Sequence, residues 1–193
     1  PTVLSLYLPM WSIDLVRRRW RSDPAAATGS SKPNTRRPDT VRRQPHLAVV
    51  LANTITGRQI VQRRCERAER AGVQPGMTLA HARALLPGGT QGVHVEPFNP
   101  KHDDDALHAL AIWATRFAPI VAPDRYQNDG LLMDITGCQR LYHGDNRLVH
   151  RLTNAVQRLG FTHVHVATAP TFGAAWAIAR FGHDHLTPSG ISP

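Results

Sequence analysis

The feature that most restricts the fold of this chain is the alternation of short apolar runs with longer amphipathic segments. The apolar runs are rich in Val, Leu and Ile and mostly end at Pro, Gly or Asn, which is typical of β-strands. The amphipathic segments carry apolar residues three or four positions apart, which indicates helices that bury one face. Strands interleaved with such helices predict an α+β domain.

The same pattern predicts where the individual elements lie. Two strands on either side of Asn53 and Gly57 are expected to form a hairpin. Thr78 is the expected N-cap of one helix, and Pro170 is expected in the first turn of the last one. The predicted strands are residues 2–8, 46–52, 58–62, 119–123, 130–136 and 162–168. The predicted helices are residues 12–20, 63–72, 78–86, 99–117, 146–159 and 170–182.

The charge of the chain indicates an anionic partner. There are 23 Lys and Arg against 14 Asp and Glu, a formal net charge of +9, and only Lys32 and Lys101 of the basic residues are lysine. Guanidinium groups pair with phosphate and so suit a nucleic acid, although an arginine bias is equally typical of a GC-rich genome.

The positive charge is concentrated in one polar segment. Residues 17–44 hold nine basic and two acidic residues, which is +7 of the total. Within it, residues 22–44 are too poor in apolar side chains to order themselves, and we predict a flexible basic loop. The alternatives for this loop are phosphate attraction and a merely solvated insertion. Its candidate nucleic-acid contacts are Arg36, Arg37, Arg42 and Arg43.

The cysteine content argues against a disulfide framework or a zinc site. Cys65 and Cys138 are the only cysteines, and their spacing is not that of paired metal ligands. No apolar run approaches the roughly 20 residues of a membrane-spanning helix. No signal-sequence pattern precedes the first strand. We therefore expect a protein of the reducing cytoplasm.

Three segments, in order, resemble the Y-family DNA polymerases, which are the lesion-bypass enzymes. They are VLSLYLPMWSIDLV, ERAERAGVQPGMTLAHARALLP and NDGLLMDITGC, and ATAPTFGAAWAIARFG resembles the helix after the last palm strand. The resemblance implies a palm at residues 1–10 and 98–183, a mixed sheet covered by helices on one face, with small fingers inserted at residues 11–97. It also implies that the thumb and little finger are absent and that residues 184–193 are a loose tail.

The positions that bind metal in this family are altered. Nucleotidyl transfer uses two metal ions held by converging carboxylates. The resemblance places these positions at Tyr7, Asp129 and Gly130, so that only the vestigial Asp129 keeps a carboxylate. A phenol and a glycine cannot replace hard oxygen ligands of magnesium. We therefore predict no catalytic residue, no metal and no other cofactor.

The resemblance also places altered residues where the family binds the nucleotide. Glu66 and Glu69 stand at the positions of a tyrosine and an arginine that hold the triphosphate, which acidic side chains repel. Trp176 stands near a phosphate-contacting lysine, and Ser12 at the aromatic position that discriminates sugars. No nucleotide binding is expected.

Within the family, the retained fold and the missing carboxylates resemble the ImuB group, the polymerase-like subunits of bacterial mutasomes. DITGC, the downstream LYHGD and GAAWAIARFG are the matching motifs. The resemblance implies a noncatalytic scaffold of SOS-induced translesion mutagenesis. Its implied partners are DNA, an ImuA-type RecA-like protein, an error-prone C-family DNA polymerase and, through regions beyond this core, the sliding clamp. The alternative is an active error-prone polymerase whose missing ligands come from Asp14 or Asp134.

Several candidate residues also have simpler interpretations. Asp129 can cap a turn, and the run from Asp103 to Asp105 suits a helix start. His163 and His165 alternate along one strand face without an evident third ligand. Four arginines line a predicted fingers helix, where they either contact nucleic acid or pair with neighbouring glutamates. These arginines are Arg63, Arg64, Arg67 and Arg70.

Overall fold

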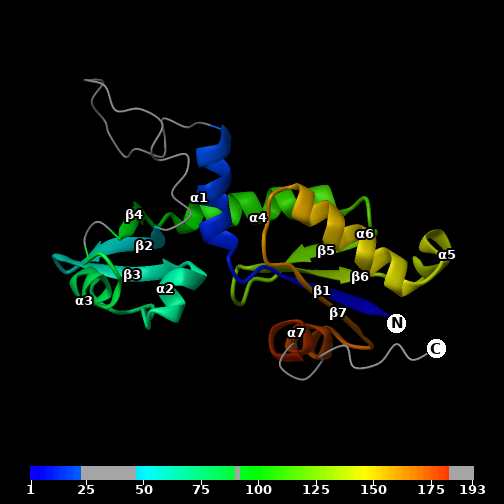
Figure 1. Cartoon of the computed structure of the whole chain (residues 1–193). Coiled ribbons are helices and arrows are strands. Elements are labelled where there is room, and N and C mark those ends of the chain that lie inside the picture. Colours follow the sequence, from blue (N-terminus) through cyan, green and yellow to red (C-terminus); the bar gives the residue numbers. More distant parts are fainter. Residues whose placement is uncertain (23–46, 90–91, 183–193) are drawn as a thin grey trace, which may run out of the picture. The chain divides into compact units, whose positions relative to one another are not determined.

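The computed structural model describes residues 1–22, 47–89 and 92–182. The chain divides into two compact units (Figure 1). Unit 1 consists of Pro1–Trp11 and Lys101–Pro193, and unit 2 of Ser12–Pro100.

Two predicted segments lie outside the described residues. One is the basic loop from residue 23 onward, and the other is the tail at 184–193. The loop arginines that therefore lie outside are Arg36, Arg37, Arg42 and Arg43.

A four-stranded sheet forms the centre of unit 1. β1 pairs with β6 on one side and with β7 on the other, and β5 pairs with β6, always antiparallel. The order β5-β6-β1-β7 is that of a split βαβ arrangement, because the chain crosses from β6 to β7 over the central β1. The strands are β1 (Val3–Tyr7), β5 (Ile120–Pro123), β6 (Gly130–Asp134) and β7 (His165–Ala169).

Helices pack on both faces of this sheet, and not on one face as expected from the sequence (Figure 1). Val3 clusters with Ala169 and with Ala175 of α7, so α7 covers one face of β1. Strand alternation places the fully buried Leu4 and Leu6 on the opposite face, the side on which α4 and α6 lie in Figure 1. Each such leucine contributes about 1.5–3 kcal/mol through burial. The helices are α4 (Pro100–Ala114), α5 (Gln139–Tyr142), α6 (Asp145–Arg158) and α7 (Phe172–Phe181).

Unit 2 contains a three-stranded sheet of mixed pairing. β2 pairs antiparallel with β3 and parallel with β4. Thr56 and Gly57 join β2 to β3 with φ values of 47° and 77°, the positive values that a two-residue hairpin turn requires. The strands are β2 (Ala48–Ile55), β3 (Arg58–Arg64) and β4 (Val93–Pro97). The helices are α1 (Trp11–Ser22), α2 (Glu66–Arg70) and α3 (Leu79–Leu85).

The α+β class and most predicted elements are confirmed. Thr78 is an N-cap, since its Oγ1 accepts a hydrogen bond from the backbone N–H of His81 at 3.3 Å. The last helix begins later than predicted, because Thr171 and not Pro170 leads into it and caps the N–H of Ala174 at 3.3 Å. β4 and α5 were not predicted. Among the described residues, no helix is long and apolar enough to cross a membrane.

Candidate functional site

Three neighbouring strands of unit 1 bring the altered metal positions together. Tyr7 at the end of β1 is the register partner of Gly130 on β6 and of His165 on β7. The rings of Tyr7 and His165 meet edge to face with their centroids 5.6 Å apart. The carbonyl of Asp129 accepts a hydrogen bond from the N–H of Leu8 at 2.9 Å. The phenol therefore stands beside Asp129 and Gly130 in the sheet itself.

Gly130 is held against the neighbouring strand. A Cβ at this position would lie 2.3 Å from the carbonyl oxygen of Leu6, a distance that real Cβ atoms do not show. The strand therefore requires glycine for a close backbone approach. A glutamate cannot be restored here without moving β1 or β6.

A buried arginine occupies the centre of the site. The same nitrogen of Arg180, Nη2, donates to Oδ2 of Asp124 at 2.7 Å and to Oδ1 of Asp129. The side chains of Arg180 and Asp124 are 6% and 5% exposed, whereas that of Asp129 is 25% exposed. Two carboxylates thus converge on a side-chain cation that belongs to the protein.

Aromatic rings complete the surroundings of this cation. The Arg180 guanidinium carbon lies 4.4 Å from the ring centre of Tyr7 and 4.3 Å from that of Trp176. These are cation–π distances. Trp176 also donates from Nε1 to Oδ2 of Asp124 at 2.7 Å. Tyr7 and Trp176 therefore form the walls around Arg180.

Asp134, the carboxylate of β6, lies at the opposite end of the strand from Gly130 and cannot supply a ligand there. Asp134 pairs in register with Val3, four residues along the strand from the Tyr7–Gly130 pair, or roughly 13 Å. Hydrogen bonds from the side chain and the backbone of Thr136 hold the pKa of Asp134 below its usual value. Within the described ranges, no group of three or more His, Cys, Asp or Glu side chains has the geometry of a metal site.

The predicted nucleotide and nucleic-acid residues of the fingers segment lie in unit 2. Ser12 is buried. Arg63 and Arg64 lie at the end of β3, and not on the helix expected at residues 63–72, because that helix begins only at Glu66. Arg64 donates to Glu69 at 2.6 Å, and the Arg63 guanidinium lies 5.0 Å from the ring centre of Phe98. Glu66 begins α2. Two further arginines, Arg67 and Arg70, are exposed. One of the expected arginine–glutamate pairs is therefore present, and two arginines remain available to a phosphate.

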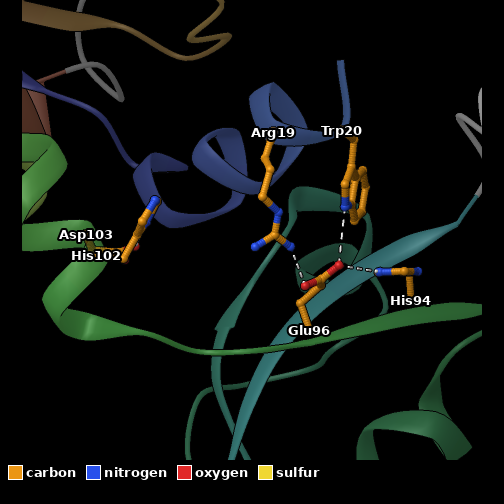
Figure 2. A network of polar contacts seen from close by, with 6 residues as sticks. All are labelled: Arg19, Trp20, His94, Glu96, His102 and Asp103. Carbon is orange, nitrogen blue, oxygen red and sulfur yellow. Dashed lines mark hydrogen bonds and ion pairs between the residues drawn. The ribbon is translucent and has the colours of Figure 1, made fainter. Parts of the chain in front are cut away.

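A second polar network joins α1 to β4 within unit 2 (Figure 2). Glu96 accepts hydrogen bonds from Arg19 at 2.6 Å, from His94 at 3.0 Å and from Trp20 at 3.2 Å. Burial alone raises the pKa of the Glu96 carboxyl, but the hydrogen bonds from His94, Arg19 and Trp20 outweigh it and lower the pKa overall. The network fixes the last turn of α1 against the sheet.

Sequence reasoning missed the two residues at the centre of the site in unit 1. Asp124 and Arg180 are 56 positions apart, and no motif links them. The available signal was the spacing of Trp176 and Arg180, which places an arginine and an aromatic ring on the same side of α7. The network around Glu96 was missed for the same reason, since Arg19 is 77 positions away.

Comparisons with known proteins identify relatives in both sequence and structure. Residues 33–180 match the model of the IMS family, impB/mucB/samB. The Protein ImuB sequences of two Caulobacter vibrioides strains, NA1000 and CB 15, are 42% identical over 120 residues, which are 62% of this chain and 25% of each relative. The match thus spans about a quarter of the length of these relatives.

Solved structures of DNA polymerases share the fold. DinB from Sulfolobus solfataricus superposes with a TM-score of 0.63 and 15% identity, over 98% of this chain and 47% of that one. Dbh DNA polymerase in a post-insertion binary complex gives a TM-score of 0.67 and 13% identity, over 93% and 45%. At this identity the likeness shows the fold alone. The family match covers more than half of the sequence, and the chain therefore belongs to the impB/mucB/samB family.

Proposed function

We propose that this chain is the noncatalytic, polymerase-like core of a scaffold protein in DNA-damage tolerance. On this proposal, residues 1–10 and 98–183 correspond to the palm and residues 11–97 to the fingers. The family relationship and the similarity to Protein ImuB support a role in translesion mutagenesis.

The observation that carries the proposal is the position of Arg180. A polymerase site needs carboxylates that are free to hold two metal ions. Here Asp129 is bound to a guanidinium, which stays charged under physiological conditions and is also held by Asp124. The residues present do not fit a two-metal centre, because an internal cation already neutralises the one carboxylate that remains at these positions.

The nucleotide side supports the same conclusion. Glu66 and Glu69 stand where the family resemblance expects groups that hold the triphosphate, and carboxylates repel that ligand. Metal binding and triphosphate binding are therefore disfavoured together, while the apolar core of the sheet is intact.

The proposed partners follow from the resemblance to the ImuB group. They are DNA, an ImuA-type RecA-like protein, an error-prone C-family DNA polymerase and the sliding clamp, the last through regions outside this core. The exposed side chains of Arg67 and Arg70 in α2 support contact with DNA phosphates. A cytoplasmic, nucleoid-associated location belongs to the same proposal.

The competing function is an active error-prone polymerase. It requires Asp14 or Asp134 to supply a missing metal ligand. Asp134 lies at the far end of β6, and Asp14 is buried and paired with Arg17 at 3.4 Å. Neither arrangement favours this alternative.

Primer extension by the full-length protein distinguishes the two functions. We expect no nucleotide incorporation with magnesium or manganese under conditions in which a Y-family polymerase extends the same primer. Incorporation that disappears in the Asp129→Ala variant would establish the active polymerase and overturn the proposal.

A further inference from the structure

The exposed face of α6 carries charge of one sign only. Leu148, Leu152 and Val156 form its buried face. The other face holds no carboxylate and no apolar side chain among its exposed residues. These are Asn146, Arg147, His150, Arg151, Asn154, Gln157 and Arg158.

Three of these residues form a straight row along the helix. Arg147, Arg151 and Arg158 are four and then seven positions apart, which at 3.6 residues per turn places them on one side of the axis. The row is about 16 Å long at 1.5 Å per residue. We call these three residues the α6 arginine row.

Helix stability alone does not favour this row. Arginines at i and i+4, as at Arg147 and Arg151, repel each other. α4 instead pairs exposed opposite charges, with Nζ of Lys101 at 2.6 Å from Oδ2 of Asp105.

No arginine of the row forms an ion pair with any residue that the structure describes. The one ring contact is that of Arg151, whose guanidinium lies 5.8 Å from the ring centre of Tyr142 in α5. The row is therefore an uncompensated cationic surface on a rigid element.

An exposed apolar residue is the sequence neighbour of Tyr142, the residue that Arg151 contacts. Leu141 precedes Tyr142 in α5 and is 73% exposed. Arginines combined with an exposed apolar side chain are typical of protein interfaces. A site for single-stranded nucleic acid would instead need aromatic rings on which bases stack, and the exposed face of α6 has none.

We propose that the α6 arginine row and Leu141 bind an acidic helical segment of a partner protein. Carboxylates spaced one and three turns along that helix match the three guanidinium groups, each of which can bind a carboxylate through two parallel hydrogen bonds. An apolar side chain of the segment packs on Leu141. This surface is separate from the site around Arg180 and does not depend on the loss of polymerase activity.

The test uses a fluorescent helical peptide with glutamates at i, i+4 and i+11 and one leucine, and measures its affinity for the 193-residue chain by anisotropy. We expect the R147Q/R151Q/R158Q variant to bind at least about tenfold more weakly, as loss of a central charged cluster typically does. A matched variant, R58Q/R116Q/R125Q, removes the same charge from exposed arginines elsewhere and should lose less than about threefold. Circular dichroism and thermal melting show whether both triple variants keep the fold. The L141A variant leaves the net charge unchanged, and we expect it to weaken peptide binding as well.

Two results would overturn the proposal. Equal losses of peptide affinity in the two triple variants would show attraction by net charge alone. A larger loss of affinity for duplex DNA in the α6 variant than in the matched variant, with peptide binding unchanged, would show that the row binds nucleic acid.

Discussion

At the residue scale, Arg180 and Asp124 form an ion pair between side chains that are 6% and 5% exposed. Burial of two charges is costly, and further groups offset part of that cost. Nη1 of Arg180 remains buried without a hydrogen-bond partner among the described residues. Trp176 donates to Asp124, and the rings of Tyr7 and Trp176 lie against the guanidinium. Tyr7 and Trp176, which the family resemblance places at altered positions, are thus also the rings that surround this internal cation.

Replacing Arg180 tests the energetic part of this account. Arg180→Met leaves Asp124 as a buried charge without its cation, and we expect a loss of about 3–5 kcal/mol in the free energy of unfolding, measured with urea. Adding Asp124→Asn in the same chain should recover much of the loss. The exposed Arg125→Met serves as the control. An Arg180→Met variant as stable as the parent would contradict the account.

Gly130 and Gly173 form a matched pair for a backbone prediction. A Cβ at Gly130 would meet the Leu6 carbonyl oxygen at 2.3 Å, whereas a Cβ at Gly173 has nothing within 4 Å. We expect Gly130→Ala to lower the free energy of unfolding by about 2 kcal/mol or more. Gly173→Ala in α7 should leave it unchanged or raise it by up to about 1 kcal/mol. Equal effects in thermal unfolding would mean that β1 and β6 do not approach as closely as described.

At the element scale, the spacing of apolar residues predicted those helices and strands whose own sequences show a regular period. β1, β6, α4 and α6 have clear apolar alternation or helical spacing. β4 was missed because it ends in Pro97 and its hydrogen-bonding partner β2 is distant in sequence and parallel to it. α5 has only four residues, which is too short for a helical period.

The residues of the candidate site likewise form two groups, those that local motifs predicted and those that only the structure brings together. Tyr7, Asp129 and Gly130 were found because local motifs resemble a family, so each could be placed by its neighbours in sequence. Asp124 and Arg180 could not be found, since their contact depends on how α7 lies over β1 and β7. Arg19 and Glu96 likewise meet only after α1 has packed on the sheet of unit 2.

The hydrogen bonds that Glu96 accepts hold α1 to the sheet of unit 2, and their contribution to stability can be tested. Glu96→Gln removes the charged acceptor of three hydrogen bonds, and we expect a loss of about 1–3 kcal/mol in the free energy of unfolding at pH 7. Because the folded-state pKa lies below its ordinary value of 4.5, the carboxylate stabilises the fold above that pH. Its contribution is lost as the pH falls through the folded-state value. The difference between parent and variant should therefore shrink below about pH 4.5.

The control for Glu96 is Asp105→Asn, which breaks an exposed pair with Lys101. Exposed pairs contribute little, so this variant should be indistinguishable from the parent in the same unfolding series. A stability difference at Glu96 that stays constant from pH 7 to pH 3 would mean that the carboxylate charge is not what holds the network.

At the scale of the whole molecule, a net charge of +9 is distributed over surfaces with different expected roles. Arg63, Arg64, Arg67 and Arg70 belong to the proposed DNA contact. The α6 arginine row belongs to the proposed protein contact. The matched region is about a quarter of the length of its curated relatives, and each surface can be tested by itself in this chain.

The DNA proposal predicts a change in salt dependence. In the R63Q/R67Q/R70Q variant, the slope of log affinity for primer-template DNA against log salt should fall by about 0.9 for each phosphate contact that is lost. The R58Q/R116Q/R125Q variant has the same net charge and should retain a steeper slope. Identical slopes in fluorescence titrations would argue against a phosphate role for Arg63, Arg67 and Arg70.

The central claim is that a protein-borne cation has replaced the catalytic metal ions beside Asp129. Addition of manganese to isotopically labelled protein tests it directly, because the paramagnetic ion broadens the NMR signals of nearby amides. Asp105, an exposed carboxylate, serves as the reference for nonspecific binding of manganese. We predict that the amide signals of Tyr7, Asp129 and Gly130 broaden no more than that of Asp105. Selective broadening of these three signals, abolished by Asp129→Ala, would show a metal site there and contradict the account.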